Sequence, residues 1–600
     1  MEAIEERLGR LKPSLEPVNG FIHLAPLDAY FTRGRTDDAQ VNVTIKAAFA
    51  IIKVLFDQLG TPDSLIATLT FDSVVFPYMD GCGPIHPAFA GLAGLLKTVN
   101  KELPQARVKI VDMAGTSAVR RRKTIARTLA TELMNPDVHT EVGYRDKGRW
   151  VLSMKPALAR RETPIIPEGS TLLVTGGAGG ITFEIITQVV RTYRTHLVIL
   201  DVNDIFSLDP RYLEPDLQQP RIMALLKQEM PGARPLEIKL QTEKVQRIRQ
   251  SRANIETLRA MGVRVDYHVT DVTDYQAVKQ AVDAHPDITG IFHAAGLEMS
   301  QFIPKKEMKS FERVVDVKVK GLVNLLRAME GRDYRFAVTF SSVTARFGNE
   351  GQADYTAAND FLGKALFREA QEHPDRTYKV YAWTAWSGVG MATHPTVMQV
   401  LRDRGIQFLP MDQGVKCFMA DLLDRQESEM VFSGLDFSFD RDGLLGDPAQ
   451  AEFPFLGTPV SHNGKSVTFA RTLDLDRDLF LRDHCIEDVP LFLGSTGIET
   501  LAEAAATLAG DRVRVTAITD FAIPYGIKIL KGRPKELMIH AEQVDTDVYA
   551  CSITSLFKNP KGIAMGNPTL HYEGRCQVSR EPLEPRSITL PPIQARNPGR

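Results

Sequence analysis

Cysteine is scarce in this sequence, with five residues in a chain of 600. They are widely spaced, without the density of a disulfide framework or the close spacing of a zinc site: Cys82, Cys417, Cys485, Cys551 and Cys576. We therefore expect reduced thiols packed as small hydrophobic side chains, no metal site, and a cytoplasmic location.

Long hydrophobic runs and an excess of charge of one sign are also missing. No window approaches about 18 uninterrupted apolar residues, as a membrane span would, and the charged N-terminus lacks the apolar core of a secretory signal. The formal net charge of −2 gives no electrostatic reason to expect nucleic acid or an anionic membrane as a partner. Hydrophobic residues make up 44% of the chain, which is enough for several buried cores.

Residues 169–445 alternate strand-like and helix-like segments, which predicts a doubly wound parallel α/β sheet. The strand-like segments are short apolar runs at residues 171–175, 197–200, 263–269, 288–293, 336–341 and 379–383. The stretch between the second and third runs, residues 203–262, is unusually long. Its later part is charged and has helical periodicity, so we interpret the stretch as a helical insertion.

The segments on either side have different patterns. Residues 1–168 also alternate strand-like and helix-like runs but contain no glycine-rich phosphate loop, which predicts an α/β companion that does not bind a dinucleotide. Residues 446–460 have the composition of a linker. In residues 461–585 one apolar helix precedes long alternating strands, which predicts an α+β domain with a helix on an antiparallel sheet. We expect the tail, residues 586–600, to fray.

A glycine-rich turn follows the first strand of the central domain. It comprises Thr175, Gly176, Gly177, Gly179, Gly180 and Ile181. Glycines at such a turn let the backbone approach a pyrophosphate at the N-terminus of the next helix. The flanking strand and helix supply the required context, so the motif predicts a dinucleotide site; the alternative is a merely structural turn.

Other residues assigned to the cofactor site lie at the ends of later strands. Asp201 ends the second strand, roughly 20 residues after the glycines, where a carboxylate can bind a ribose 2′-hydroxyl and repel a 2′-phosphate. This favours NADH, unless Asp201 only begins the insertion and faces solvent. Asp271, followed by Val272, could accept from the adenine amino group, although a helix cap is the alternative. The fourth strand leads into Ala294, Ala295 and Gly296.

Four side chains are suited to the reduction of a ketone by hydride. The charge that develops on the ketone oxygen needs a proton donor nearby. Tyr355 is the candidate donor, and Lys318 is the cation that could bring its pKa toward neutrality. Ser342 ends a strand and could bind the same oxygen, while Asn359 lies one helical turn after Tyr355. Each residue type alone is more often structural, but their combination with the glycine loop predicts a nicotinamide-dependent reductase.

Residues 20–440 resemble the ketoreductase of polyketide and polyunsaturated fatty acid synthases, a split short-chain dehydrogenase/reductase whose structural half precedes its catalytic half. The matching stretches are FIHLAPLDAY, GLAGLLKTVNKEL, LLVTGGAGGIT, IFHAAGLE, FERVVDVKVKGLVNLL, FSSVTARFGNEGQADYTAANDFLG and AWTAWSGVGMA. The family's lysine, serine, tyrosine and asparagine correspond to Lys318, Ser342, Tyr355 and Asn359. The long insertion, and Thr182 in place of the usual final glycine, resemble the polyunsaturated fatty acid and enediyne branch.

The resemblance implies two Rossmann-like doubly wound subdomains, NADPH as the cofactor, and a β-ketoacyl substrate tethered to the phosphopantetheine of an acyl carrier protein. It also implies other synthase domains as partners. The chain departs from the family at Asp201 and Val202, where Gly-Arg usually holds the 2′-phosphate of NADPH, so NADH stays possible. It carries no Leu-Asp-Asp signature after Gly296, and Phe347 replaces a diagnostic tryptophan, so the alcohol configuration is open.

Residues 460–580 resemble the first hot-dog half of a synthase dehydratase. His484 precedes the apolar helix, so it could remove the α-proton of a β-hydroxyacyl thioester whose carbonyl lies near the amide of Gly494. The family has glycine and proline where this chain has Asp488 and Leu493, and its partner aspartate lies in a second half. Hot-dog domains usually pair, so a homodimer is possible.

Three functions are compatible with these motifs. The first is reduction of a β-ketoacyl thioester carried on an acyl carrier protein, within a polyketide or fatty acid synthase. The second is a bifunctional ketoreductase and dehydratase, which His484 suggests. The third is a non-catalytic scaffold module that binds the cofactor and docks carrier proteins.

Overall fold

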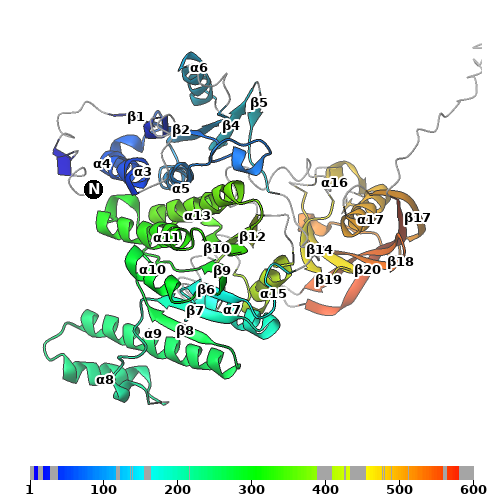
Figure 1. Cartoon of the computed structure of the whole chain (residues 1–600). Coiled ribbons are helices and arrows are strands. Elements are labelled where there is room, and N and C mark those ends of the chain that lie inside the picture. Colours follow the sequence, from blue (N-terminus) through cyan, green and yellow to red (C-terminus); the bar gives the residue numbers. More distant parts are fainter. Residues whose placement is uncertain are drawn as a thin grey trace, which may run out of the picture. The chain divides into compact units, whose positions relative to one another are not determined.

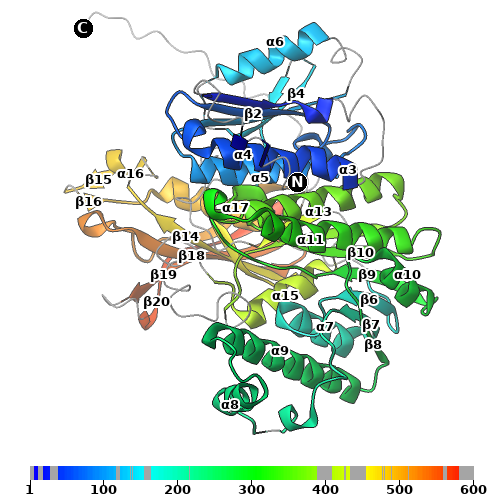
Figure 2. The same cartoon turned by 90° about the vertical axis from the view of Figure 1, so that its left-hand side faces the viewer.

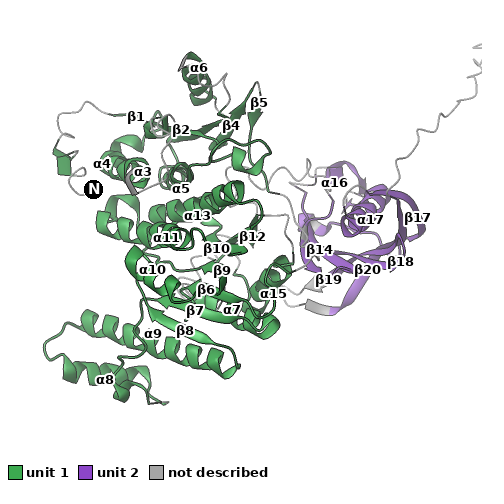
Figure 3. Cartoon of the chain, in the orientation of Figure 1, with its two compact units in different colours: residues 1–154, 159–445 green, residues 155–158, 446–600 purple. Residues whose placement is uncertain are grey.

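The computed structural model forms two compact units (Figures 1 and 3). Unit 1 comprises residues 1–154 and 159–445, and unit 2 comprises residues 155–158 and 446–600. The predicted tail, and residues 446–454 of the predicted linker, lie outside the described residues. The described residues are 6–7, 9–10, 18–27, 38–115, 122–135, 137, 139–146, 148–154, 164–214, 216–387, 408–423, 428–432, 455–475, 478, 480–487, 489–510, 513–558 and 564–579.

Unit 1 contains a seven-stranded parallel sheet in the order β12-β11-β10-β9-β6-β7-β8. Its strands are β6 (Thr171–Thr175), β7 (His196–Asp201), β8 (Val265–Val269), β9 (Ile288–His293), β10 (Phe336–Ser342), β11 (Thr377–Trp383) and β12 (Glu429–Phe432). The strand order reverses at β6, between β7 and β9. In doubly wound sheets, ligands bind outside the carboxyl ends of the strands at this point.

Helices cover both faces of this sheet, as the predicted doubly wound fold requires. One face packs against α10 (Tyr275–Asp283), α11 (Met308–Ala328) and α13 (Ala353–Glu372). The other face packs against α7 (Gly180–Tyr193), the second half of α9 (Pro235–Ala260), and α15 (Met411–Asp421). Short turns of helix connect these elements at η4 (Pro210–Tyr212), η5 (Ile303–Lys305) and α12 (Thr344–Phe347).

The N-terminal half of unit 1 forms a second sheet in the order β1-β2-β3-β4-β5. Parallel pairing joins β1 (Gly20–His23), β2 (Leu65–Phe71), β3 (Arg107–Met113) and β4 (Glu141–Arg145), while β5 (Gly148–Trp150) is antiparallel. Apolar side chains of α4 (Ala47–Leu59) and α5 (Pro87–Glu102) cover one face, and those of α6 (Arg122–Leu133) cover the other. Shorter helical segments are α3 (Asp38–Val41), η2 (Asn42–Lys46) and η3 (Phe76–Tyr78). The predicted division of unit 1 near residue 168 stays a prediction.

The two halves of unit 1 meet where α5 packs against α13, between the two sheets (Figures 1 and 2). The helices approach closely because α5 presents glycines at the contact. A Cβ atom on Gly94 would lie 2.6 Å from the backbone oxygen of Thr356, and one on Gly91 would lie 3.2 Å from that of Ala357. Larger residues at these positions would push α13 away from its place.

Buried charges join the same two helices. Lys97 of α5 donates to Glu141 at 2.7 Å and to Asp360 of α13 at 2.8 Å. Asp360 also accepts from Arg346, which pairs with Glu429 at 3.3 Å. Because isolated buried charges are unfavourable, each member depends on its partners for compensation.

The predicted insertion folds into a helical hairpin of α8 (Gln219–Glu229) and α9. The outer part of α9 packs against α8 around Ile222, Leu226, Ile238 and Val245. Its inner part contributes Ile248, Ile255 and Leu258 to the core under the seven-stranded sheet. The hairpin is therefore fixed to the sheet at one end of α9.

Unit 2 is an antiparallel sheet with one long helix on it, as the sequence predicts. The sheet order is β13-β14-β18-β19-β20-β17, and α17 (Gly494–Ala509) packs on it through Leu501, Ala504 and Ala505. The other elements are α16 (Phe480–Asp483), η9 (Leu530–Gly532) and the hairpin β15 (Cys485–Ile486) and β16 (Val489–Pro490). The sheet consists of β13 (Thr458–His462), β14 (Ser466–Leu473), β17 (Arg514–Ala522), β18 (Lys535–Asp545), β19 (Val548–Lys558) and β20 (Ala564–Ser579). In the described part of the chain, none of the helices is both long and apolar enough to cross a bilayer.

Replacing Asp360 by Asn is expected to destabilise unit 1 by about 3–5 kcal/mol, because Arg346 and Lys97 would lose a buried partner. The chain's three tryptophans, Trp150, Trp383 and Trp386, all belong to unit 1. Urea unfolding followed by tryptophan fluorescence therefore reports the stability of this unit.

The matched control is Asp412→Asn, which breaks an exposed pair with Lys416 on α15 and should change stability by no more than about 0.5 kcal/mol. Equal effects of the two substitutions would contradict a stabilising network.

Burial opposes ionisation of Asp360, but Arg346 and Lys97 lower its pKa to about 2. The ionised carboxylate of Asp360 therefore contributes fully to the stability of unit 1 above about pH 4, the usual pKa of an aspartate. This contribution should disappear as the pH falls toward 2.

Candidate functional site

The glycine-rich turn leads from β6 directly into α7. Gly176 and Gly180 have φ angles of +66° and +58°, which are unfavourable for residues with a side chain. A Cβ atom on Gly176 would lie 3.2 Å from the backbone of Ala295, whereas positions beyond Gly179 and Gly180 are open. The N-terminus of α7 therefore offers backbone amides and a positive helix end to an anionic group, and these residues fit a dinucleotide.

Thr175 and His293 connect the strand ends beside this turn. The hydroxyl of Thr175 accepts from the amides of Ala294 and Ala295 at 3.2 and 3.1 Å and lies 3.0 Å from Nδ1 of His293. Nε2 of His293 lies 3.0 Å from the carbonyl oxygen of Lys318, so Nε2 carries the proton. Burial, followed by Lys318, lowers the pKa of His293 to about 3, so the ring is a neutral bridge to the lysine-bearing helix.

The sequence assigns Thr175 to the cofactor site, and this assignment stays a prediction. The side chain of Thr175 holds Ala294 and Ala295 in place together with His293, which sequence reasoning missed. The available signal was a polar residue at the end of the otherwise apolar strand Ile288–His293.

A second support of the glycine turn comes from the insertion. Asn254 of α9 is buried and donates its side-chain amide to the carbonyl oxygen of Ala178 at 2.9 Å. The two residues are far apart in sequence, so no local pattern predicts the contact. The insertion thus fixes the backbone of the cofactor turn.

Asp201 and Asp271 both lie at the carboxyl ends of strands, and each closes a local turn. Oδ1 of Asp201 accepts from the backbone and side-chain nitrogens of Asn203 at 3.0 and 2.9 Å. Asp201 is half-buried, and this burial raises the pKa of its carboxyl. Asp271 is exposed, and its Oδ1 accepts from the amide and hydroxyl of Thr273 at 2.9 and 2.8 Å. Val272 is buried, and its carbonyl oxygen accepts from Asn324 at 2.9 Å.

Lys318 and Tyr355 lie together beside the end of β10. The ammonium of Lys318 is 5.4 Å from the ring centroid of Tyr355, and it donates to the carbonyl oxygen of Phe340 at 3.0 Å. Room for Lys318 comes from Gly296, where a Cβ atom would lie 2.8 Å from Cε of the lysine. Burial lowers the pKa of Lys318 to about 8.

The expected lowering of the Tyr355 pKa by Lys318 is not found. Burial, with the negative charge of Glu298, raises the pKa of Tyr355 to about 12. The reason is that the ammonium is held by Phe340 rather than by the phenol, so the penalty of burying a phenolate prevails.

Asn359 lies one turn after Tyr355 and is fully buried. Its amide nitrogen donates to the backbone oxygen of Tyr355 at 2.9 Å, and its own backbone oxygen accepts from Ser341 at 3.1 Å. Its Oδ1 has no hydrogen-bond partner among the described residues. A buried unpaired acceptor is unfavourable by about 1–3 kcal/mol, so a water molecule or ligand is expected beside it.

Ser342 ends β10 with its hydroxyl prepared to donate. Its Oγ accepts from the amide of Thr344 at 3.3 Å and from the hydroxyl of Thr344 at 3.1 Å. A hydroxyl has two acceptor positions and one hydrogen. Because both acceptor positions are used, the hydrogen remains for a further acceptor, such as a carbonyl oxygen.

A buried ion pair flanks Tyr355 on its helix. Asp354 pairs with Lys306 at 2.7 Å, and Lys306 also donates to the carbonyl oxygen of Met299 at 2.8 Å. Asp354 thereby connects the start of α13 with the loop after β9. Sequence reasoning missed both residues, because a charged residue beside a catalytic motif does not reveal a partner 48 positions away.

His484 of unit 2 lies next to the hairpin that precedes α17. Its Nδ1 is 2.7 Å from the carbonyl oxygen of Leu491, so Nδ1 carries a proton, and in the neutral ring Nε2 would carry the lone pair that a general base requires. The helix begins at Gly494, as expected for the proposed carbonyl site. Asp488, one of the two departures from the dehydratase pattern, lies outside the described residues.

Comparison with known protein families identifies two segments. Residues 170–388 match the family model described as KR domain, and residues 453–556 match the model described as polyketide synthase dehydratase domain. Domains of the first kind bind NAD(P)H. The second segment includes His484.

Curated relatives are much longer than this chain. Polyketide synthase PksM of Bacillus subtilis (strain 168) is 24% identical over 73% of this chain and 10% of that protein. One polyunsaturated fatty acid synthase polypeptide of Thraustochytrium sp. is 25% identical over 72% of this chain and 15% of that protein. The chain therefore spans 10–15% of the length of these two relatives.

Solved structures share the fold of unit 1. A ketoreductase domain from the bacillaene assembly line matches with a TM-score of 0.53 and 18% identity, over 72% of this chain and 96% of that one. The first ketoreductase of the tylosin polyketide synthase matches with a TM-score of 0.53 and 23% identity, over 73% and 83%. Residues 170–388 therefore match the KR domain model and unit 1 shares the Rossmann-like fold of solved ketoreductases, while residues 453–556 match the polyketide synthase dehydratase domain model.

Proposed function

We propose that this chain reduces the β-keto group of an acyl thioester, carried on an acyl carrier protein, to a β-hydroxyl within a polyketide or fatty acid synthase. The proposal rests on one observation: Tyr355, Lys318 and Asn359 gather at the carboxyl end of β10, in the same sheet as an open glycine turn. A reduced nicotinamide bound at that turn would supply hydride to the carbonyl carbon. The described residues would hold the ketone and supply the proton.

Tyr355 is the proposed proton donor. Its raised pKa keeps the phenol protonated at neutral pH, which is the state a donor needs. As negative charge develops on the ketone oxygen, the proton moves to that oxygen, and the ammonium of Lys318 stabilises the phenolate left behind. Ser342 donates its remaining hydrogen to the same oxygen.

Asn359 is the proposed start of the path that returns a proton to Tyr355. Its unpaired Oδ1 and the buried ammonium of Lys318 border the phenol on the protein side. A water molecule accepted by Oδ1 would connect them. A lysine with a pKa of about 8 can lose and regain a proton near physiological pH, as a relay requires.

The cofactor-holding residues are proposed to be the glycine turn, Ala294 to Gly296, Asp271 with Val272, and Asp201. Relatives with Gly-Arg at the end of the second strand are expected to prefer NADPH, whereas Asp201 and Val202 offer no cation to a 2′-phosphate. We propose that this chain accepts NADH at least as well as NADPH.

Tyr355→Phe should lower kcat for a β-ketoacyl N-acetylcysteamine thioester by at least about a hundredfold, because a positioned proton donor contributes roughly 10²–10⁴. Cofactor binding should be unchanged. The measurement is NAD(P)H oxidation by absorbance, with cofactor titration by fluorescence. Turnover equal to that of the unmodified chain would overturn the assignment, and cofactor binding without turnover by the unmodified chain would support the scaffold alternative.

Exchanging Asp201 and Val202 for Gly and Arg should shift the cofactor preference. The ratio of kcat/KM for NADPH to that for NADH is expected to rise at least about tenfold, since a 2′-phosphate would gain a cation and lose a repelling carboxylate. Asp271→Asn is the control and should leave this ratio unchanged. If this ratio does not change in the double variant, the 2′-position of the cofactor ribose does not lie at the end of β7.

Dehydration of the β-hydroxyacyl product is a second candidate function, and the protonation of His484 favours it. Because Nδ1 donates to Leu491, Nε2 is available to remove an α-proton. Loss of water also needs an acid for the leaving hydroxyl. A second copy of unit 2, or another synthase domain, is the proposed source of that acid.

His484→Gln should abolish any formation of enoyl thioester from a β-hydroxyacyl thioester while leaving ketone reduction unchanged. Mass spectrometry of the acyl group distinguishes the two products. The control His540→Gln changes a histidine that bonds Thr468 between β14 and β18 and should retain both activities. Enoyl formation that persists in His484→Gln would exclude His484 as the base.

A further inference from the structure

The α8–α9 hairpin is strongly basic, although the whole chain is slightly acidic. Residues 219–260 contain nine Lys or Arg and four Glu, a net charge of +5, in a chain of net charge −2. Five of these cations are exposed and form no ion pair with any described residue: Arg221, Lys227, Lys239, Lys244 and Arg247. The remaining basic side chains are used within the fold, as when Arg249 donates to the carbonyl oxygens of Glu214 and Leu217.

Two of the unpaired cations of α9 share a face with exposed apolar residues. Leu236 and Leu240 are 63% and 54% exposed and lie one turn apart. Lys244 and Arg247 continue the same face, because steps of four and three residues return to one side of a helix. These two cations repel each other at that spacing, so the surface is not arranged for the stability of the isolated helix.

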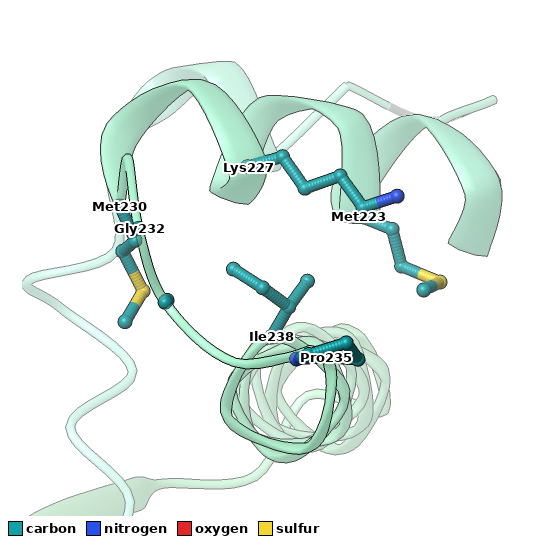
Figure 4. A pocket seen from close by; sticks show the side chains of 7 residues that line it. Met223, Lys227, Met230, Gly232, Pro235 and Ile238 are labelled. Carbon is teal, nitrogen blue, oxygen red and sulfur yellow. The ribbon is translucent and has the colours of Figure 1, made fainter.

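A separate hollow lies between α8 and α9, on the side of α9 that carries Ile238, about half a turn around the helix from Leu236 and Leu240. It has a volume of about 280 Å³ and is lined by Met223, Lys227, Met230, Gly232, Ala233, Pro235 and Ile238. Figure 4 shows Lys227 and Met223 extending from α8 over the hollow and Ile238 pointing into it from α9.

We propose that this hairpin docks the carrier protein that brings the substrate, through an acidic helix of the carrier. This inference rests on the proposed function. Apolar side chains of the carrier helix would pack on Leu236 and Leu240, and its carboxylates would pair with Lys244 and Arg247 on the same face of α9. Charge complementarity selects this occupant, because unpaired cations beside exposed leucines on one helix face match an amphipathic acidic helix.

The outer part of α9 lies close to the proposed cofactor site. Arg247 lies seven residues before Asn254 on the same helix, a distance of about 10 Å. Asn254 holds the carbonyl oxygen of Ala178 in the glycine turn. A carrier bound to the outer part of α9 would therefore be held close to the proposed cofactor site.

The test compares two charge-reversal variants that lower the net charge equally. Lys244→Glu with Arg247→Glu changes α9, and Lys123→Glu with Arg127→Glu changes exposed cations on α6. The substrates are a β-ketoacyl group on an acidic, phosphopantetheinylated carrier protein and the same group as an N-acetylcysteamine thioester. The α9 variant should raise KM for the carrier-bound substrate about tenfold at low salt, with the difference shrinking at high salt. The α9 variant should keep its kcat and KM for the N-acetylcysteamine thioester. The α6 variant should keep its kcat and KM for both substrates.

Leu240→Ser tests the apolar part of the surface and should also raise KM for the carrier-bound substrate alone. Equal effects of the α9 and α6 variants, or no effect of either, would overturn the docking site. Tighter binding of transfer RNA or anionic phosphatidylserine vesicles than of carrier, lost in the α9 variant, would assign the surface to those partners and overturn the proposal. Self-association of the unmodified chain, measured by sedimentation and abolished in the α9 variant but not in the α6 variant, would also overturn the proposal.

Failure of docking is distinguishable from failure of the proposed reduction. If the unmodified chain reduces neither substrate, the proposed function fails. Fluorescence anisotropy of labelled carrier protein, without an acyl group, still measures docking on the full chain. Binding that weakens about tenfold in the α9 variant and not in the α6 variant would support the surface, and unchanged binding would overturn it.

Discussion

The close packing of α5 on α13 is the contact on which the rest of unit 1 depends. Helix α13 carries both Tyr355 and Asn359, and α5 fixes its position from the side opposite the sheet. The approach requires glycine at residues 91 and 94. Glu102, near the end of α5, also accepts from the amides of Ile303 and Gly351 at 2.8 and 2.9 Å. An N-terminal half without a dinucleotide loop therefore shapes the site by holding the helix and loops around it.

The candidate site combines residues that burial affects in opposite directions. The pKa of Tyr355 is raised and that of Lys318 is lowered. At neutral pH the phenol is therefore protonated, and the ammonium of Lys318 loses its proton more readily than an exposed lysine does. Each shift disfavours a charged form. A ketone that becomes an alkoxide places new charge between them, which is the event that such a pair is suited to compensate.

Local motifs predicted the residues of the site, and tertiary contacts determined how they are held. The glycine turn and the four-residue spacing of Tyr355 and Asn359 are visible because each belongs to one turn or one helix. The bond from Asn254 to Ala178 joins residues 76 positions apart, and that from Lys97 to Asp360 joins residues 263 apart. No periodicity reveals such pairs. The contact of Lys318 with the backbone carbonyl oxygen of Phe340 could not be predicted either, because every residue has a backbone carbonyl group.

The buried charge network has a consequence for the connection between the halves of unit 1. Lys97 and Glu141 of the first half balance each other, as do Arg346 and Lys364 with Asp360 and Glu429 in the second half. Within this network, the groups contributed by each half therefore sum to no net charge. None of these contacts involves residues 155–163. A chain interrupted there would keep the complementary surfaces, and the two fragments would recognise each other without a covalent link.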